Sequence, residues 1–410
     1  MDSGNIGFVM LCAAFVFFMT PGLSCFYGGL VRRKNAVNTM FTSVVTIATG
    51  IVMWMLIGYS LSFGPDHGGV IGDFSWFGLE GVSLTEPYVE GQGIPNMVFC
   101  LFQMMFAVIT PALITGSVAG RMKFKSLFVF LVLWSLVVYY PMAHMVWADG
   151  GFLAKIGSVD FAGGNVVHIS SGITALTLCI LLGKRYDYKR ANYKIHNTPM
   201  VALGAFILLF GWFGFNAGSA LAADGLAAHA FVTTAVSSAA AMLSWMFCDV
   251  VVNKKPTFVG ACTGMVAGLV GITPGAGFVP IWAALIIGLT TSPICFFMIS
   301  WVKEKFGYDD ALDAFGCHGV GGICTGLFCK VSINDIGQGN GLFFGDTKLF
   351  LMQLASIGIT IVVSVAGTLI CYGITRLVTG KIRVTEREER VGLDRSQHGE
   401  SAYPSFNGLD

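Results

Sequence analysis

Charged side chains are scarce in this sequence of 410 residues, since Asp, Glu, Lys and Arg together make up only 11% of it. A typical soluble domain is about 25% charged, so the shortage argues against a protein whose whole surface faces water. The 24 basic and 23 acidic residues nearly balance, and no basic stripe of the kind that binds nucleic acid is present. Hydrophobic residues account for 55%, which indicates that lipid is the surrounding medium.

Other absences exclude further classes of protein. No basic segment precedes the first apolar run, which begins near Ile6, so we interpret that run as a membrane span rather than a cleaved signal peptide. The 11 cysteines are an odd number and fall almost entirely inside apolar runs, so no disulfide framework is expected. No HExxH motif is present, and we expect no metal and no cofactor.

Long apolar runs define the fold class, because a membrane helix needs about 20 mostly apolar residues. The sequence predicts an all-α integral membrane protein with eleven transmembrane helices. The predicted spans cover residues 6–30, 37–63, 95–120, 126–147, 161–183, 198–220, 227–252, 257–274, 279–302, 310–330 and 347–376.

The charges between the spans predict an orientation. Basic residues gather in alternate breaks (32–34, 121–125, 184–194, 254–255 and 303–305), whereas the opposite loops carry mainly acids. Under the positive-inside rule the N-terminus lies outside, and an odd number of spans then places the C-terminus in the cytoplasm. We therefore predict a transmembrane domain at 1–379 and a cytoplasmic tail at 380–410, which is either a solvated end or a docking segment.

Two short repeats relate the halves of the chain. AVITPA at 107–112 returns as VGITPG at 270–275, and VDFAGGNVVH ending at His168 resembles LDAFGCH ending at His318. Each pair joins a span to the one five spans later, which runs in the opposite direction. The sequence therefore predicts two inverted five-helix repeats plus a final helix, an arrangement that places substrate chemistry at mid-membrane between the halves.

The spacing of two histidines supports this interpretation. His168 follows Asp160 by eight residues, or about 12 Å of helix, and His318 follows Asp310 by eight from the opposite side. In a hydrocarbon core about 30 Å thick, both would lie at nearly the same depth. Buried ionisable residues are costly in a membrane, so the pair is read as pathway residues or a proton relay. The alternative is that each histidine has a purely structural role as a hydrogen-bonded packing residue.

A metal site is the competing interpretation of the same histidines. Its ligands would be His168 and His318 with Cys317 and Cys324. Neighbouring positions on a helix diverge by about 100°, however, so Cys317 and His318 cannot easily face one ion.

Aromatic residues converge outside the predicted histidine layer. Phe102 and Phe106 share a face of the third span, Trp147 ends the fourth, and Trp212, Phe215 and Ser219 share a face of the sixth. Ring faces and one hydroxyl suit a small cation that donates hydrogen bonds. The alternatives are an interfacial aromatic belt for Trp147 and helix packing for the phenylalanines.

Four motifs resemble those of the ammonium transporter family, the Amt/Mep/Rh group. They are FYGGLVRRKN after the first span, DFAGGNVVHISSG around His168, GWFGFNAGSA around Phe215 and DDALDAFGCHGVGG around His318. The likeness extends over essentially the whole chain. It implies a homotrimer of eleven-helix subunits in the cell membrane, each with its own pore between pseudo-symmetric halves.

The resemblance also implies roles for the candidate residues. Ammonium would be recruited by Trp147, Phe106, Ser219 and Phe102. A gate would be formed by Phe106 and Phe215, with support from Trp212. The paired pore imidazoles would be His168 and His318, and the structural acid would be Asp160. Trp147 and Ser219 favour the Amt branch. The tail, with GLD at 392–394 and HGESAY at 398–403, is similar to tails regulated by PII signalling proteins, which implies a cytoplasmic partner of that type.

The predicted function is therefore ammonium transport rather than enzymatic catalysis. Ammonium would bind at the rings, lose a proton and cross an apolar pore as ammonia. An ammonium sensor of the same fold that signals through its tail is the main alternative, and an intramembrane metalloenzyme is a third. Whether the histidines relay the proton or only hydrogen-bond ammonia stays open at this point.

Overall fold

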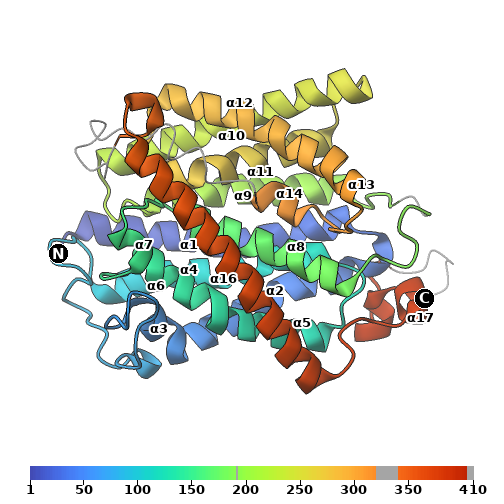
Figure 1. Cartoon of the computed structure of the whole chain (residues 1–410), viewed down its shortest axis with the longest axis horizontal. Helices are drawn as coiled ribbons and strands as arrows, with labels where there is room; N and C mark the ends of the chain where they lie inside the picture. Colours follow the sequence, from blue (N-terminus) through green and yellow to red (C-terminus); the bar gives the residue numbers. More distant parts are fainter. Residues whose placement is uncertain (191–192, 320–339, 404–410) are drawn as a thin grey trace.

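The computed structural model describes residues 1–190, 193–319 and 340–403. Within these ranges ten helical segments are long and apolar enough to cross a membrane (Figure 1). They are Ser3–Leu30, Arg33–Phe63, Asn96–Val118, Phe124–Lys155, Gly164–Leu182, Thr198–Gly218, Gly225–Asn253, Phe258–Gly275, Ile281–Phe306 and Thr347–Thr379. Each corresponds to one of the predicted spans. Of the remaining predicted span, 310–330, the described part contains only the short helix α14, Ala314–His318.

Side-chain caps fix where several helices begin. The carboxylate of Asp2 accepts the Asn5 N–H at the start of α1 (Ser3–Leu30). Asn197 caps α9 (Thr198–Gly218), Asp224 caps α10 (Gly225–Asn253) and Thr257 caps α11 (Phe258–Ile272) in the same way. These short polar side chains satisfy backbone N–H groups that have no partner within the helix.

Glycines bring α1 and α9 into close contact along their length. A Cβ added to Gly204 of α9 would lie 2.3 Å from the backbone nitrogen of Phe26, and Gly211, Gly214 and Gly218 are equally crowded by α1. Lipid provides no hydrophobic drive between helices, so small residues that allow the backbones to approach are what favours packing. The first and sixth spans consequently form a tight pair.

Several spans are locally interrupted. Pro21 lies inside α1, Pro111 inside α4 (Asn96–Val118) and Pro293 inside α12 (Ile281–Phe297). π-helical turns occupy 54–58, 135–139, 164–169 and 298–302. Membrane helices tolerate such interruptions where side chains or neighbouring helices satisfy the freed backbone groups.

The helices that carry the two histidines begin later than the sequence predicted. The fifth span starts at Gly164 with the π-helical turn η5 (Gly164–Ile169) and continues as α8 (Ser170–Leu182), after Gly163 at φ +116°. α14 starts at Ala314, after Asp313 at φ +58°. The prediction of eight helical residues between each acid and its histidine is therefore wrong, because a left-handed residue at the same position of both repeats delays the helix. Since the two delays are equal, the equal depth survives.

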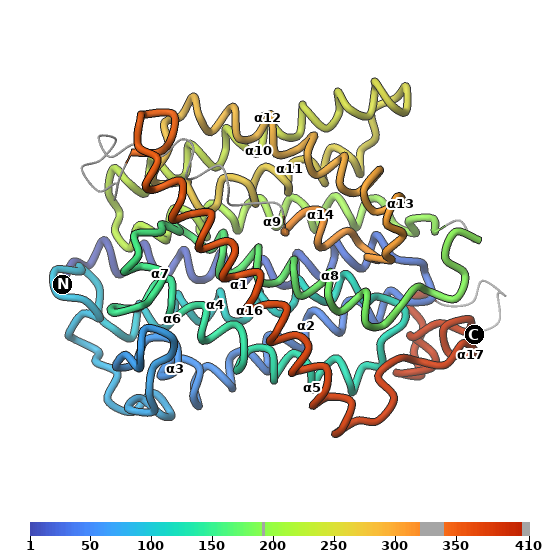
Figure 2. The backbone as a smooth tube through the Cα atoms, in the orientation of Figure 1, coloured from blue at the N-terminus to red at the C-terminus, as the bar shows by residue number. Residues whose placement is uncertain are grey.

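The last spanning helix, α16 (Thr347–Thr379), runs obliquely across α8 and α5 (Phe124–Trp134), as Figures 1 and 2 show. Near one end, the Gln353 amide bonds both the N–H and the carbonyl of Val159, at 2.9 and 2.7 Å. The N-terminus and the tail lie at opposite ends of the molecule (Figure 2). We call these ends the N-face and the C-face.

The described part of the tail is folded rather than a solvated end. It contains α17 (Glu386–Val391), closed by a capping box of Thr385 and Glu388, and the π-helical turn η10 (Asp394–His398). The Asp394 carboxylate accepts the Asn38 N–H at 2.8 Å, and the Leu393 N–H donates to Asn35 Oδ1 at 2.9 Å. The tail thus covers the start of α2 (Ala36–Met53) at the C-face.

Candidate functional site: a narrow pore with an aromatic mouth

The two histidines meet inside the bundle. Their Nδ1 atoms are 3.3 Å apart, and their ring planes are inclined by only 12°. Trp212 lies nearly parallel to His168, with centroids 5.3 Å apart and planes at 15°. All three side chains are buried, and His168 Nε2 has no hydrogen-bond partner among the described residues. The equal depth predicted for His168 and His318 from spacing is confirmed by this contact.

A narrow cavity runs past the pair. Its volume is about 20 Å³, close to the room that one water molecule needs. The lining combines the imidazoles with mostly apolar side chains from α1, α4, α9 and α11, including Leu23, Ile109 and Val266. A lumen of this size and composition admits a small neutral molecule and offers it few polar partners besides the histidines, among them Tyr27 and Asp313.

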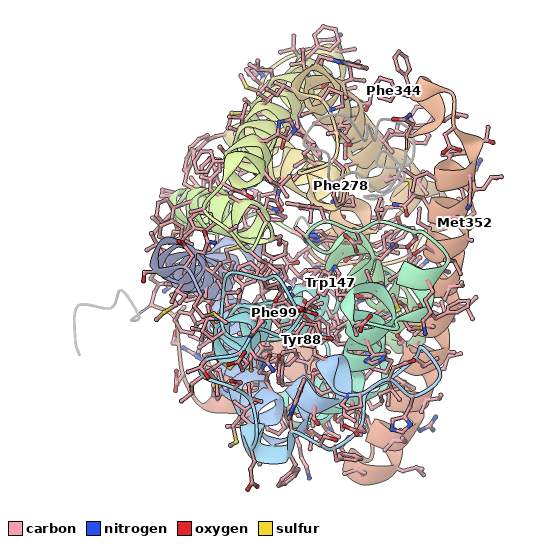
Figure 3. The ribbon with its side chains drawn as sticks, turned by 90° about the vertical axis from the view of Figure 1, so that its left-hand side faces the viewer. Tyr88, Phe99, Trp147, Phe278, Phe344 and Met352 are labelled. Atoms are coloured by element: carbon pink, nitrogen blue, oxygen red, sulfur yellow. The ribbon has the colours of Figure 1, made fainter. Side chains whose placement is uncertain are left out.

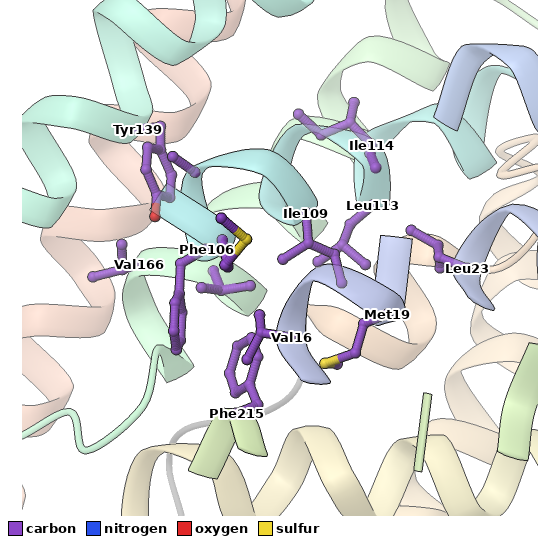
Figure 4. Close-up of a cluster of buried hydrophobic side chains, with 14 of the residues drawn as sticks. Val16, Met19, Leu23, Phe106, Ile109, Leu113, Ile114, Tyr139, Val166 and Phe215 are labelled. Carbon is purple, nitrogen blue, oxygen red and sulfur yellow. The ribbon is translucent and has the colours of Figure 1, made fainter. Parts of the chain in front are cut away.

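Aromatic rings close the lumen toward the N-face. The rings of Phe106 and Phe215 lie 4.3 Å apart between centroids, and Figure 4 shows them facing each other. Phe106 also meets Phe102 edge-on at 5.0 Å and Trp147 edge-on at 5.9 Å. Helix packing alone is therefore not the environment of these phenylalanines, because their rings separate two cavities.

The second cavity lies above these rings at the N-face. It has a volume of about 150 Å³ and is lined by Phe102, Phe106, Trp147 and Ser219 together with Tyr88 and other residues of the loop before α4. Figure 3 shows Trp147, Phe99 and Tyr88 side by side at this end. Phe102, Phe106, Trp147 and Ser219 converge as predicted. Trp212 and Phe215 line the lumen instead, and the prediction that Trp212 lies outside the histidine layer is wrong, because its ring packs against His168.

Ser219 presents an acceptor to this cavity. Its hydroxyl donates to the Phe215 carbonyl at 2.9 Å. Because the hydroxyl proton is used in that bond, the oxygen can act only as an acceptor toward a ligand in the cavity. Lone pairs beside ring faces favour a cation that carries N–H donors over one that carries none.

Gln103 lines the same cavity and was missed by sequence reasoning. Its side chain is 8% exposed, and its Oε1 has no hydrogen-bond partner among the described residues. It directly follows Phe102 on α4 and lies three residues before Phe106, so it reaches the same cavity from the adjacent side of the helix. The sequence signal was a single amide among apolar residues of this helix. Buried amides normally have hydrogen-bond partners, so a lone one indicates a group that binds a ligand.

Asp160 does not reach the aromatic cavity as a ligand. Its carboxylate accepts the N–H groups of Gly163, Gly164 and Asn165 at 2.6–2.8 Å, and that of Val166 at 3.4 Å. Its own backbone carbonyl accepts the Trp147 indole N–H at 2.9 Å. One buried acid therefore holds the start of the His168 helix and the ring of Trp147 together.

Toward the C-face the lumen opens into a vestibule of about 540 Å³. Phe26, Leu312, Asp313 and Cys317 line both spaces, so the vestibule adjoins the lumen. Asp313 is paired there with Lys303 at 2.6 Å. The molecule thus contains a path from an aromatic cavity at one face to a polar vestibule at the other, interrupted by the Phe106 and Phe215 rings.

The metal interpretation receives no support from the described residues, in which no group of three His, Cys, Asp or Glu is arranged to hold an ion. Cys324 lies outside the residues that the structure describes. Cys317 does line the lumen beside His318.

Ten membrane-length helices around an apolar lumen with buried imidazoles define a multi-pass membrane protein built for a small solute. The sequence matches the Ammonium Transporter Family over residues 7–403. The chain belongs to the ammonium transporter family, as its motifs predicted.

Individual relatives agree with this assignment. An ammonium transporter of Bacillus subtilis (strain 168) is 46% identical over 407 residues, which cover 98% of this chain and 99% of the relative. The crystal structure of Saccharomyces cerevisiae Mep2 matches with a TM-score of 0.86 and 35% identity, over 94% of this chain and 91% of that one. A solved sensor Amt protein matches with a TM-score of 0.86 and 26% identity, over 96% and 98%.

Proposed function

We propose that this protein transports ammonium by binding the cation in the aromatic cavity, removing one proton and conducting ammonia through the lumen. The observation that carries the proposal is the order of environments from the N-face inward: ring faces with a hydroxyl acceptor, two phenylalanines in contact, and an apolar lumen containing the histidine pair. The ring faces suit the ammonium cation, the phenylalanines suit a solute that has lost its water, and the apolar lumen suits neutral ammonia.

Recruitment is assigned to Trp147, Phe106, Phe102 and Ser219, with Gln103 as an additional acceptor. A cation over a ring gains about 0.5–2 kcal/mol, depending on its desolvation. The engaged proton of Ser219 and the unpartnered Oε1 of Gln103 leave two acceptors for N–H donors. Ammonium carries four such donors, whereas potassium carries none.

The gate is assigned to Phe106 and Phe215, with Trp212 supporting it. Their rings lie between the two cavities, so a hydrated ion has to shed its water to pass. A bare cation in an apolar lumen is prohibitively costly, and neutral ammonia is not. Potassium cannot lose a proton and is therefore rejected, even where the aromatic cavity binds it.

His168 and His318 are assigned to the lumen as the groups that hydrogen-bond ammonia. Their Nδ1 contact also provides a route for the released proton, because imidazole both accepts and donates. If the histidines relay the proton, transport carries an electrical current. If they only hydrogen-bond ammonia, transport carries none. Electrical current recorded from reconstituted protein during ammonium pulses, together with measured ammonia uptake, distinguishes the two. Ammonia uptake without current would overturn the relay, and potassium flux comparable to ammonia flux would overturn the proposal as a whole.

In this proposal the N-face is outside and the C-face is cytoplasmic, with residues 1–379 as the transport domain and 380–410 as a regulatory tail. The basic residues of the loops at 32–34 and 184–194 lie with the tail, as the positive-inside rule requires. Cysteine labelling from one side of sealed cells tests the orientation. The subunits assemble as a homotrimer in the cell membrane, which mass measurement of the detergent-solubilised protein tests, and a mass equal to one chain would contradict it.

The partner of the C-face is proposed to be a PII-type signalling protein. The tail, the first loop and the loop after α8 form one composite surface there, joined by Lys34 to the Glu389 and Arg390 carbonyls and by Arg390 to the Tyr186 hydroxyl. Co-purification with the PII protein of the same organism tests the partner. Equal recovery with a variant truncated after residue 379 would show that the tail is not part of the binding surface.

A sensor remains the second candidate, favoured by the similarity to the sensor Amt protein. The two functions separate in the variant truncated after residue 379, provided that it still reaches the membrane. A transporter keeps selective ammonia flux through the lumen, whereas a sensor that signals through its tail loses its response and shows no flux in either form.

A further inference from the structure

We infer that Thr273 is a positioning residue for the pore: its hydroxyl fixes the Trp212 indole, and through that ring the orientation of His168. The inference rests on the proposed function, in which His168 hydrogen-bonds ammonia. It also gives a role to VGITPG at 270–275, one half of the short repeat in the sequence.

Thr273 is the acceptor for a buried indole. Trp212 Nε1 donates to Thr273 Oγ1 at 2.8 Å, and both side chains are almost completely buried. The same hydroxyl donates to the Leu269 carbonyl at 2.7 Å, one turn earlier. Because its proton is engaged with that carbonyl, the hydroxyl oxygen offers only lone pairs to the indole. Trp212 therefore has a fixed partner rather than a freely rotating one.

The indole transmits this constraint to the imidazole. Trp212 lies nearly parallel to His168, which in turn meets His318 edge to edge through Nδ1, with nearly parallel planes. His168 has no hydrogen bond at Nε2 among the described residues, so its ring plane is defined by the contact with His318 and by the neighbouring rings, of which Trp212 is nearer than Phe215. A rotation of the indole therefore changes the direction in which Nε2 points into the lumen.

The residue that follows Thr273 contacts the same histidine helix from another side. The Pro274 carbonyl accepts the Phe161 N–H at 3.0 Å, and a Cβ added to Gly164 would lie 2.5 Å from the Pro274 ring. The start of η5, which carries His168, is thus seated on the Thr273–Pro274 junction. Thr273 and Pro274 hold His168 through its aromatic neighbour and through its backbone.

The other copy of the repeat provides a matched control. Thr110 precedes Pro111 and donates to the Phe106 carbonyl four residues earlier at 2.6 Å, just as Thr273 does to Leu269. Thr110 is equally buried, but among the described residues it accepts no indole N–H. Substitution of the two threonines by valine removes the same hydroxyl–carbonyl bond in both halves, and only in one half does it also remove the acceptor for Trp212.

The test compares Thr273→Val with Thr110→Val in reconstituted vesicles. We expect Thr273→Val to lower the maximal ammonia flux about 10-fold, since small misplacements of a positioned group cost rate steeply. The half-saturating ammonium concentration should change less than about twofold, because no residue of the aromatic cavity is altered. Thr273→Ser, which keeps the hydroxyl, should restore the flux. Thr110→Val should leave the maximal flux near that of the unsubstituted protein.

A second variant covers the case in which Thr273→Val fails to fold. Trp212→Phe keeps an aromatic ring but has no N–H, so it should produce the same loss of maximal flux with unchanged half-saturation. The inference is overturned if Thr273→Val behaves as Thr110→Val, or if folded Thr273→Ser fails to restore flux. His168→Ala, measured alongside, reports on the proposed function separately: flux and selectivity that survive this substitution contradict the proposed pore, whatever Thr273→Val does.

Discussion

His168 and His318 face each other through the same ring atom, with Nδ1 to Nδ1 at 3.3 Å. A hydrogen bond between identical nitrogens requires that one carries a proton and the other does not, so two neutral rings in contact hold opposite tautomers. The Nε2 atoms then differ as well, one being an acceptor and the other a donor. The lumen consequently offers ammonia both kinds of hydrogen bond.

Replacing either histidine should disable selective conduction. We expect His168→Ala and His318→Ala each to lower ammonia flux by about 10-fold or more, in line with the loss of a positioned proton-transfer group, or to admit potassium where the lumen fills with water. Ammonia uptake and potassium leak are measured in the same vesicles. His67→Ala, in an exposed loop at the N-face, serves as the control. Unchanged flux and unchanged selectivity in both pore variants would contradict the mechanism.

Gln103 should contribute to ammonium binding rather than to the maximal rate. Gln103→Leu removes an acceptor and is expected to raise the half-saturating ammonium concentration about 2- to 10-fold, the usual range for one net hydrogen bond. Gln103→Glu adds a carboxylate and should make potassium a stronger competitor. Gln92→Leu is the matched control, because Gln92 lies in the same cavity but its Oε1 already accepts the Val89 N–H. If the two leucine variants change the half-saturating concentration equally, Gln103 does not bind ammonium.

Asp160 should matter chiefly for stability of the pore. Asn at this position replaces one of the two oxygens that accept backbone N–H groups by a donor. We expect Asp160→Asn to cost about 3 kcal/mol or more, since buried N–H groups are left without partners, and to lower the melting temperature together with the flux. Asp149→Asn, at a neighbouring exposed carboxylate, should change stability by less than about 0.5 kcal/mol. Similar melting temperatures for the two variants would show that the cap is dispensable.

Docking of the tail should weaken in acid. His398 packs against the stacked rings of Phe41 and Phe124, and its Nε2 is 2.9 Å from Asn38 Nδ2. Burial lowers the pKa of His398 and outweighs Asp394 and Glu400, which raise it. The docked tail therefore binds the neutral imidazole, so docking is fully stabilised above the pKa of the undocked histidine, about 6.5, and is lost progressively as the pH falls below it.

Limited proteolysis of the tail between about pH 7.5 and about pH 5.5 checks this expectation. Cleavage should accelerate toward the acid end in the unsubstituted protein. His398→Gln, which cannot be protonated in this range, should show little of that acceleration relative to a peptide substrate cleaved in parallel. The same pH dependence in both proteins would assign the effect to another group.

The positions of most site residues were predictable because their spacing is local. Phe102 and Phe106, or Trp212 and Phe215, share a face of one helix, and this follows from the helical repeat alone. The contact of His168 with His318 was predictable for a different reason. The prediction assumed that each helix begins at its acid, Asp160 or Asp310, and both helices in fact begin four residues later. Because the two helices are delayed equally, the predicted equal depth of the histidines still holds.

The residues that were missed depend on partners far away in the chain. Thr273 is one threonine among many until Trp212, 61 positions away, donates to it. Gln103 was visible as one amide in an apolar stripe, but only the structure shows that its oxygen has no partner among the described residues. The tail could equally have been solvated, because its fold depends on Asn35 and Asn38 at the other end of the sequence.

The sequence by itself determined ten of the spans, the paired histidines and the family, because the lipid demands long apolar runs and tolerates few ionisable residues, each of which then stands out. Tertiary structure alone decided where the histidine helices begin, what holds their rings, and that the tail is docked. The rings and the tail are held by hydrogen bonds between distant segments, such as Trp212 to Thr273 and Asn38 of α2 to Asp394. Such bonds form only when packing has brought donor and acceptor within 3 Å of each other, at distances that spacing along one helix does not specify.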